Sequence, residues 1–312
     1  MRPLLLLVTA ALAACGPPVS NPFGSTGGSG GATGYGVPSS GHPDWQERTV
    51  LALTNAMRVA PADWKAHWAD GDLGSALGSA YPAVPPLRWN AALGASSLAH
   101  SQDMASTPCF QHNSCDGTSW STRIASYYGL SGFIGENIAA GYGSPDEVLF
   151  AWACDGSSGA CAADGSGSDG HRANLMRAGF AALGVGFAVG GSGTYGDYWT
   201  QDFGGTADGS APPLVDASHD LLSDGSTRFF TNYYDSAPPR SVTLYLDGSA
   251  EPLPLALGSA AQGAYALDAA GATACRSYYV VAVDATGASW RYPASGSLRT
   301  FGEGGCAEDY GD

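Results

Sequence analysis

The chain has 312 residues, and its 13 lysines and arginines are outnumbered by 28 aspartates and glutamates, which gives a formal net charge of −15. So few cations argue against a protein that binds a nucleic-acid backbone, and against one that docks electrostatically on anionic lipid. The length is sufficient for two domains.

Residues 1–15 have the pattern of an export signal. Arg2 supplies the positive end, Leu4 to Val8 are apolar, and Leu12-Ala13-Ala14-Cys15 resembles the lipobox of bacterial lipoproteins. The pattern predicts removal of residues 1–14 and a lipid on Cys15, which would hold the protein to a membrane of the bacterial cell envelope, outside the cytoplasm. An ordinary signal peptide cut nearby is the alternative, whereas the apolar run is too short for a transmembrane anchor.

Residues 16–44 are rich in glycine, serine and proline and carry almost no charge. Such a composition cannot bury a core, so we expect a flexible tether between the anchor and the first domain.

Six cysteines remain when Cys15 is set aside, and in an exported protein an even number predicts disulfides, although six allow fifteen pairings. A zinc site is the competing interpretation, but the export signal and the absence of a tight Cys-x-x-Cys disfavour it. Proximity in the sequence suggests the pairs Cys109–Cys115, Cys154–Cys161 and Cys275–Cys306.

Apolar spacing predicts a helix from Trp45 to Ala60, ended by Pro61. A second helix is expected to open at residues 87–90 and to run to about Ser106. Its small residues Ala92, Ala95 and Ala99 would let it approach a sheet closely.

Two further helices follow. One is predicted from Ser121 to Tyr128, with Gly129 as its C-cap. The other begins at Ser144-Pro145-Asp146-Glu147, which has the spacing of a capping box, so Glu147 has a structural role. Large and small residues alternate from Ala182 to Val189, which indicates a strand, and Tyr198 to Phe203 is a second one.

Four motifs occur in order along this part of the chain: Phe110-Gln111-His112-Asn113, Gly135 to Tyr142, Asp169 to Met176, and Tyr198 to Phe203. Together they resemble the CAP superfamily of cysteine-rich secretory, antigen 5 and pathogenesis-related proteins, over roughly residues 45–205. The resemblance implies an α+β fold, with a three-layer α/β/α sandwich as a CAP (SCP) domain over residues 45–210.

The same resemblance implies a cleft with two histidines and two acids, and the matching residues are His112, Glu136 and His171. The second acid usually follows a tryptophan, so Asp155, after Trp152, is the nearest match and is one methylene shorter. Asp169 is an alternative, because a Gly/Ser/Ala-rich insert separates Asp155 from His171.

Two neutral imidazoles can bind a divalent cation such as zinc, which would make His112 and His171 metal ligands. Catalysis would also need a carboxylate to take a proton from water, and Glu136, with Asp155, is the candidate. The alternative is a hydrogen-bonded polar cluster without turnover. No Gly-x-Ser-x-Gly elbow supports a serine nucleophile.

Pro212-Pro213 marks a boundary, and short strands are predicted beyond it: Arg228 to Tyr234, Val242 to Asp247, Tyr278 to Asp284 and Ser289 to Tyr292. Residues 213–312 are therefore expected to form a small all-β sandwich of immunoglobulin or fibronectin type.

Two functions are compatible with these features. The first is a lipid-anchored extracytoplasmic module that binds a protein, glycan or lipid ligand. The second is a metal-assisted hydrolase acting on a cell-envelope or extracellular polymer. The sequence leaves open whether the protein is an enzyme, because one fold hosts many functions.

Overall fold

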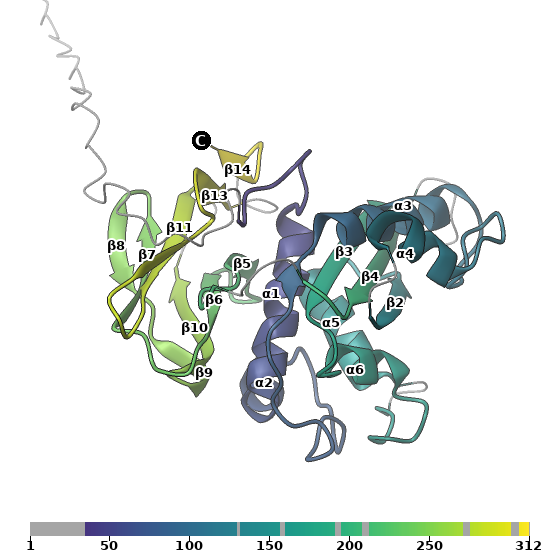
Figure 1. Ribbon diagram of the computed structural model, residues 1–312, viewed down its shortest axis with the longest axis horizontal. Coiled ribbons are helices and arrows are strands. Elements are labelled where there is room, and N and C mark those ends of the chain that lie inside the picture. Colours follow the sequence, from purple (N-terminus) through teal and green to yellow (C-terminus); the bar gives the residue numbers. More distant parts are fainter. Residues whose placement is uncertain are drawn as a thin grey trace, which may run out of the picture. The chain divides into compact units, whose positions relative to one another are not determined.

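A four-stranded sheet forms the centre of the first half of the chain (Figure 1). The computed structural model describes residues 35–129, 132–156, 160–190, 195–207, 212–270, 275–300 and 306–311. The predicted export signal, Cys15 and most of the predicted tether lie outside these residues. In the described part of the chain, no helix is both long enough and apolar enough to cross a membrane.

The order of this sheet is β1-β3-β4-β2, with β1 parallel to β3 and the other pairs antiparallel. The predicted strand over residues 182–189 is confirmed, and the motif around Glu136 is itself an edge strand. The expectation that the second helix opens at residue 87 was wrong, because Arg88 pairs with β3 and the Asn90 side chain caps the helix. The strands are β1 (Arg88–Trp89), β2 (Ile134–Ala140), β3 (Ala182–Val189) and β4 (Asp197–Gly204).

Helices cover both faces of the sheet, which confirms the three-layer α/β/α arrangement. On one face, Ser101 of α3 bonds Thr200 of β4; on the other, Gln201 of β4 bonds Thr54 of α1. The face with α3 (Ala91–Ser106) also holds α4 (Trp120–Tyr128), and the face with α1 (Trp45–Val59) also holds α5 (Pro145–Cys154) and α6 (Gly170–Leu175); α2 (Pro61–His67) follows α1.

The contact between α3 and β3 is unusually close. A Cβ added to Gly184 would lie 2.1 Å from the Gly94 nitrogen, and the Ser97 hydroxyl donates to the Gly184 carbonyl at 3.1 Å. The prediction that Ala92, Ala95 and Ala99 form the contact face was wrong, since Ala95 is exposed. Glycines on the strand and serines on the helix provide the small contact surface instead.

The second half of the chain is all-β, as predicted. One antiparallel sheet has the order β5-β6-β10-β9, and the other has the order β14-β13-β11-β7-β8 with β12 also beside β11. If the strands are lettered in chain order, β5, β6, β9 and β10 are A, B, D and E, so the first sheet has the A-B-E-D order of an immunoglobulin-type sandwich. The bounds are β5 Ser218–Leu221, β6 Thr227–Tyr234, β7 Ser241–Leu246, β8 Ser249–Pro252, β9 Leu255–Ser259, β10 Gln262–Ala269, β11 Ser277–Val283, β12 Ser289–Tyr292, β13 Ser297–Arg299 and β14 Tyr310–Gly311.

Helix α1 packs against the central sheet and also against β5, β6 and β10 of the sandwich. Every residue of α1 except Gln46 is buried. Asn55 donates to Asp216 at 2.7 Å, and Asn232 of β6 donates to the Ala52 carbonyl at 2.8 Å. Apolar residues of both halves, such as Val50 and Phe230, belong to one core. The two halves therefore share a hydrophobic core around α1.

All three predicted disulfides are confirmed. Cys109 bonds Cys115, Cys154 bonds Cys161, and Cys275 bonds Cys306. The first closes the loop that carries His112, and the second begins the insert before His171. Each therefore restricts the backbone near one of the two histidines.

Candidate functional site

His112 lies in the loop that follows α3, and its ring is half exposed. The loop is held at one end by the Cys109–Cys115 disulfide, and the Cys115 amide donates to the Asp103 carboxylate on α3 at 2.7 Å. Nδ1 of His112 is 2.8 Å from Oε1 of Glu136. This contact joins the loop to strand β2.

Glu136 is buried on β2, and both of its oxygens are engaged. Oε1 faces His112, and Oε2 accepts a hydrogen bond from the Arg123 guanidinium of α4. Arg123 also donates to the His112 carbonyl at 3.1 Å. One arginine therefore positions both members of the His112–Glu136 pair.

His171 makes a second histidine–carboxylate pair, with Asp155. Asp155 ends α5 in the left-handed region, at φ 51°, and its carboxylate accepts from the His171 amide at 2.7 Å and contacts the His171 Nδ1 at 2.6 Å. Aspartate adopts this conformation more readily than most residues, because its short polar side chain can bond locally. The backbone turn therefore aims the Asp155 carboxylate at the start of α6.

Asp169, the alternative acid, bonds to groups other than His171. Its carboxylate accepts from the Tyr81 hydroxyl at 2.5 Å and from the Gly165 amide at 2.6 Å. Asp164 of the same insert accepts from the amides of Leu77 and Gly78. The described part of the insert is thus fixed to the loop before β1, and Asp169 has a structural role there.

Two asparagines connect the two pairs. Asn137 donates to the His171 carbonyl at 3.2 Å, while Asn174 donates to the Glu136 carbonyl at 3.1 Å and to the Asn137 side chain at 3.0 Å. Neither asparagine was predicted to have a role, although Asn137 lies within residues 135–142 and Asn174 within residues 169–176. No hydrogen bond joins His112 to His171 directly among the residues described. The four predicted site residues thus form two histidine–carboxylate pairs linked through two asparagines, and no three of them bring ligand atoms within 4.8 Å of one another.

Each histidine uses Nδ1 for its carboxylate, which leaves Nε2 available to a ligand. Histidines that bind metals commonly have this arrangement, because a carboxylate on one ring nitrogen fixes the orientation of the other. The two rings can therefore act as metal ligands or as hydrogen-bonding groups toward a bound molecule.

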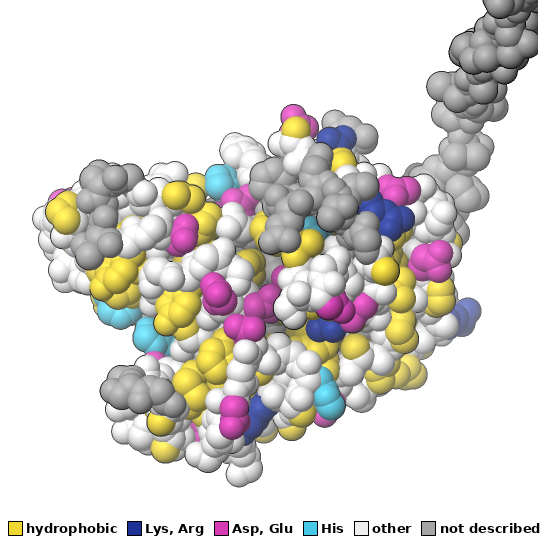
Figure 2. All heavy atoms as spheres, turned by 180° about the vertical axis from the view of Figure 1, so that it is seen from behind, with side chains coloured by type: hydrophobic (Ala, Val, Ile, Leu, Met, Phe, Trp, Pro, Cys, Tyr) yellow, Lys and Arg dark blue, Asp and Glu magenta, His cyan; other side chains and the backbone are white. Residues whose placement is uncertain are grey.

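Exposed aromatic side chains gather around Phe110, which is two residues before His112 in the chain. Phe110 and Tyr195 are each 45% exposed, and their rings meet edge to face at 5.8 Å between centroids. Tyr195 also lies against Gly141, next to the exposed Tyr142. We call Phe110, Tyr142 and Tyr195 the aromatic strip. Apolar side chains are exposed on other parts of the molecule as well, and acidic ones gather near the middle of one face (Figure 2).

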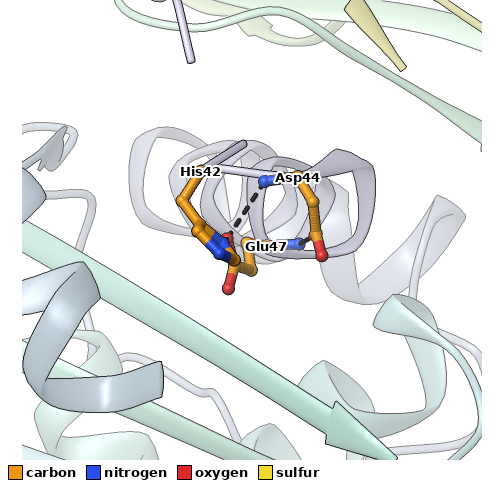
Figure 3. A group of neighbouring side chains, drawn as sticks. All are labelled: His42, Asp44 and Glu47. Atoms are coloured by element: carbon orange, nitrogen blue, oxygen red, sulfur yellow. Dashed lines mark hydrogen bonds and ion pairs between the residues drawn. The ribbon is translucent and has the colours of Figure 1, made fainter. Parts of the chain in front are cut away.

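A second group of potential ligands lies at the start of α1, where His42, Asp44 and Glu47 each bring one ligand atom within 4.8 Å of the others (Figure 3). Within the described chain, it is the only group of three histidine, cysteine or acidic side chains that is so compact. This group was not predicted from the sequence, although Asp44 and Glu47 have capping-box spacing.

Hydrogen bonds account for much of this geometry. The Asp44 carboxylate accepts from the Glu47 amide at 2.9 Å, and Glu47 accepts from the Asp44 amide at 3.0 Å. Burial raises the pKa of Glu47 to about 7, and the contact with Glu47 raises the pKa of His42. The fully buried Arg48 is close by, and its guanidinium donates a hydrogen bond to the Pro43 carbonyl. A bound cation would have to compete with the helix cap and with this positive charge.

Comparison with known proteins gives three findings. The model of the cysteine-rich secretory protein family, CAP, matches residues 51–203. The uncharacterised protein YkwD of Bacillus subtilis strain 168 is 34% identical over 120 residues, which make up 38% of this chain and 40% of YkwD. The 1.5 Å crystal structure of an extracellular protein containing an SCP domain from Bacillus anthracis strain Ames is 27% identical, with a TM-score of 0.29, and the alignment covers 38% of this chain and 34% of that one. The chain thus spans less than half the length of either protein.

Proposed function

Residues 51–203 form a domain of the cysteine-rich secretory protein (CAP) family, and from this premise we propose that the protein is an exported, lipid-anchored module that binds a ligand or partner through its paired histidines. The observation that supports binding most directly is that a carboxylate orients each of the two histidine rings. Each imidazole has its Nδ1 on a carboxylate, so it is held in place with Nε2 toward a ligand.

In this proposal a divalent cation such as zinc would take His112 and His171 as its ligands, with Glu136 and Asp155 as the carboxylates that orient them. Zinc bound there would supply a Lewis-acidic centre for an oxygen or nitrogen atom of the ligand. The protein residues contribute the orientation of the rings, and the buried Arg123 balances the charge of Glu136.

The aromatic strip offers a second contact surface to the same partner. Exposed Phe and Tyr rings present large apolar area at a low cost in side-chain entropy, and they are enriched at recognition surfaces. A protein segment, a glycan or a lipid could use it, whereas the net charge of −15 disfavours nucleic acid.

The competing hypothesis, a metal-assisted hydrolase, requires Glu136 to accept a proton from water. Both Glu136 oxygens already face donors, Oε1 the His112 ring and Oε2 the Arg123 guanidinium. A catalytic base needs an oxygen within hydrogen-bond reach of the proton it takes. This occupancy favours the binding module over the hydrolase.

Zinc titration tests the site. Zinc at about 100 times its dissociation constant should stabilise the wild-type protein by about 2.7 kcal/mol, seen as a rise in melting temperature. The double variant His112→Ala/His171→Ala should lose this rise, and a His42→Ala control should keep it. If the His42→Ala variant alone lost the rise, the zinc site would be at the start of α1 instead.

Anchoring is tested separately, because Cys15 lies outside the described residues. Cys15→Ser should move the protein expressed in a bacterium from the detergent phase to the aqueous phase, since the lipid supplies the membrane affinity. Unchanged partitioning would contradict the lipoprotein hypothesis and leave the zinc result unaffected.

A further inference from the structure

Asp202 is a buried carboxyl that the sequence analysis and the proposed function do not use. It lies on β4 directly opposite Glu136 of β2, so the two side chains share the face of the sheet under α3 and α4. Asp202 is fully buried, and neither of its oxygens has a hydrogen-bond partner of normal geometry. Its backbone amide donates to Ser97 of α3 at 3.1 Å, which fixes the residue under the helix.

The nearby positive charge of Arg123 stabilises an ionised Asp202 less than burial and the Glu136 charge destabilise it. Arg123 of α4 directs its donors to Glu136, to the His112 carbonyl and to Ser114. On α3, the Asp103 carboxylate accepts a hydrogen bond from the Cys115 amide. Burial lowers the pKa of His100, also on α3, which favours the neutral form of its ring. The opposite neighbour on β3 is Gly184, which has no side chain.

An ionised Asp202 would therefore be buried beside the Glu136 charge, with the neutral Ser96 hydroxyl as its nearest side-chain donor. A buried charge that is neither paired nor hydrogen-bonded costs several kcal/mol, and a proton removes that cost. Burial first, and then the negative charge of Glu136, raise the pKa of Asp202 well above its ordinary value.

We propose that Asp202 is a protonated carboxylic acid at neutral pH and that its hydroxyl donates to the carboxylate of Glu136. The proton stays on Asp202, Glu136 carries the single negative charge of the pair, and Arg123 balances it. Asp202 is then a positioning residue: with Arg123 and His112 it gives Glu136 three donors, which hold the carboxylate toward the His112 ring. This inference does not depend on zinc or on the identity of any ligand.

The substitution Asp202→Asn tests the protonation state, because asparagine keeps the shape and a donor but cannot ionise. An unfolded aspartate ionises above about pH 3.9, whereas the folded Asp202 keeps its proton, so rising pH favours the unfolded wild type. The folding constant of the wild type, divided by that of the variant, should fall about tenfold per pH unit between pH 5 and 7. Other titrating groups cancel in this ratio, and a flat ratio would overturn the proposal.

A second measurement covers the case in which the Asp202→Asn variant does not fold. The carboxyl carbon of Asp202 in the wild type, observed by NMR with labelled aspartate, should have the chemical shift of a protonated acid at pH 7. In Glu136→Gln the neighbouring charge is gone, so Asp202 should lose its proton at a lower pH than in the wild type. An ionised Asp202 at pH 7, or a titration unchanged by Glu136→Gln, would contradict the proposed pair.

Discussion

A chain cut to residues 35–211 should fail to fold, although it contains the whole CAP domain. Helix α1 would lose the sandwich that covers one of its sides, and Asn55 would lose Asp216. The shared core would lose Phe230 and Leu257, each of which contributes about 1.5–3 kcal/mol by burial. Together these losses approach the total stability of an ordinary domain, about 5–15 kcal/mol.

Circular dichroism and thermal unfolding measure this outcome. The matched control is a chain of residues 35–312, which should fold and unfold in one cooperative transition, because the two halves share a core. A folded 35–211 fragment, or two separate transitions in the control, would show that the sandwich is an independent domain.

Adding a methyl group at Gly184 or Gly186 should be the most damaging single change in the sheet. The new Cβ would lie 2.1 Å from the Gly94 nitrogen or 2.2 Å from the Leu98 nitrogen, both backbone atoms of α3. The helix would have to move away from β3, and overpacking of this kind costs about 1–3 kcal/mol and sometimes more. Because Asp103 on α3 holds the His112 loop, the shift should also weaken zinc-dependent stabilisation.

Urea unfolding of Gly184→Ala and Gly186→Ala measures the effect. Gly196→Ala is the matched control, because nothing lies within 4 Å of its added Cβ, and it should have nearly wild-type stability. Equal stability of Gly184→Ala and Gly196→Ala would mean that α3 does not need the close contact with β3.

Local features of the fold could be predicted from the sequence. Ser144 caps α5 as predicted, but Glu147 accepts from the Gly143 amide and not from the Ser144 amide, so its role is structural without the full capping box. Alternating residues in β3 and β7 gave the correct strands. Close sequence spacing gave the correct partner for each cysteine. Apart from the Cys275–Cys306 pair, which is 31 positions apart, these features depend on residues a few positions apart, so local patterns determine them.

The family motifs predicted four candidate site residues, but they left two acids as candidates beside His171. The left-handed turn at Asp155 brings that carboxylate to His171, while Tyr81, from a loop far away in the sequence, holds Asp169. The spacing of residues along one segment does not encode a partner from another segment. Only the tertiary structure could separate the two acids.

The burial of α1 and the position of Asp202 also required the tertiary structure. An apolar pattern shows which side of a helix is buried, but the polar residues Asn55 and Thr49 are buried too, because the sandwich supplies their partners. Asp202 faces Glu136 because β4 pairs antiparallel with β2, and the register between strands distant in sequence is set by the packing of the whole sheet. The sequence by itself determined the elements and the chemical groups; the tertiary structure decided which groups meet, because those contacts join residues far apart in the chain.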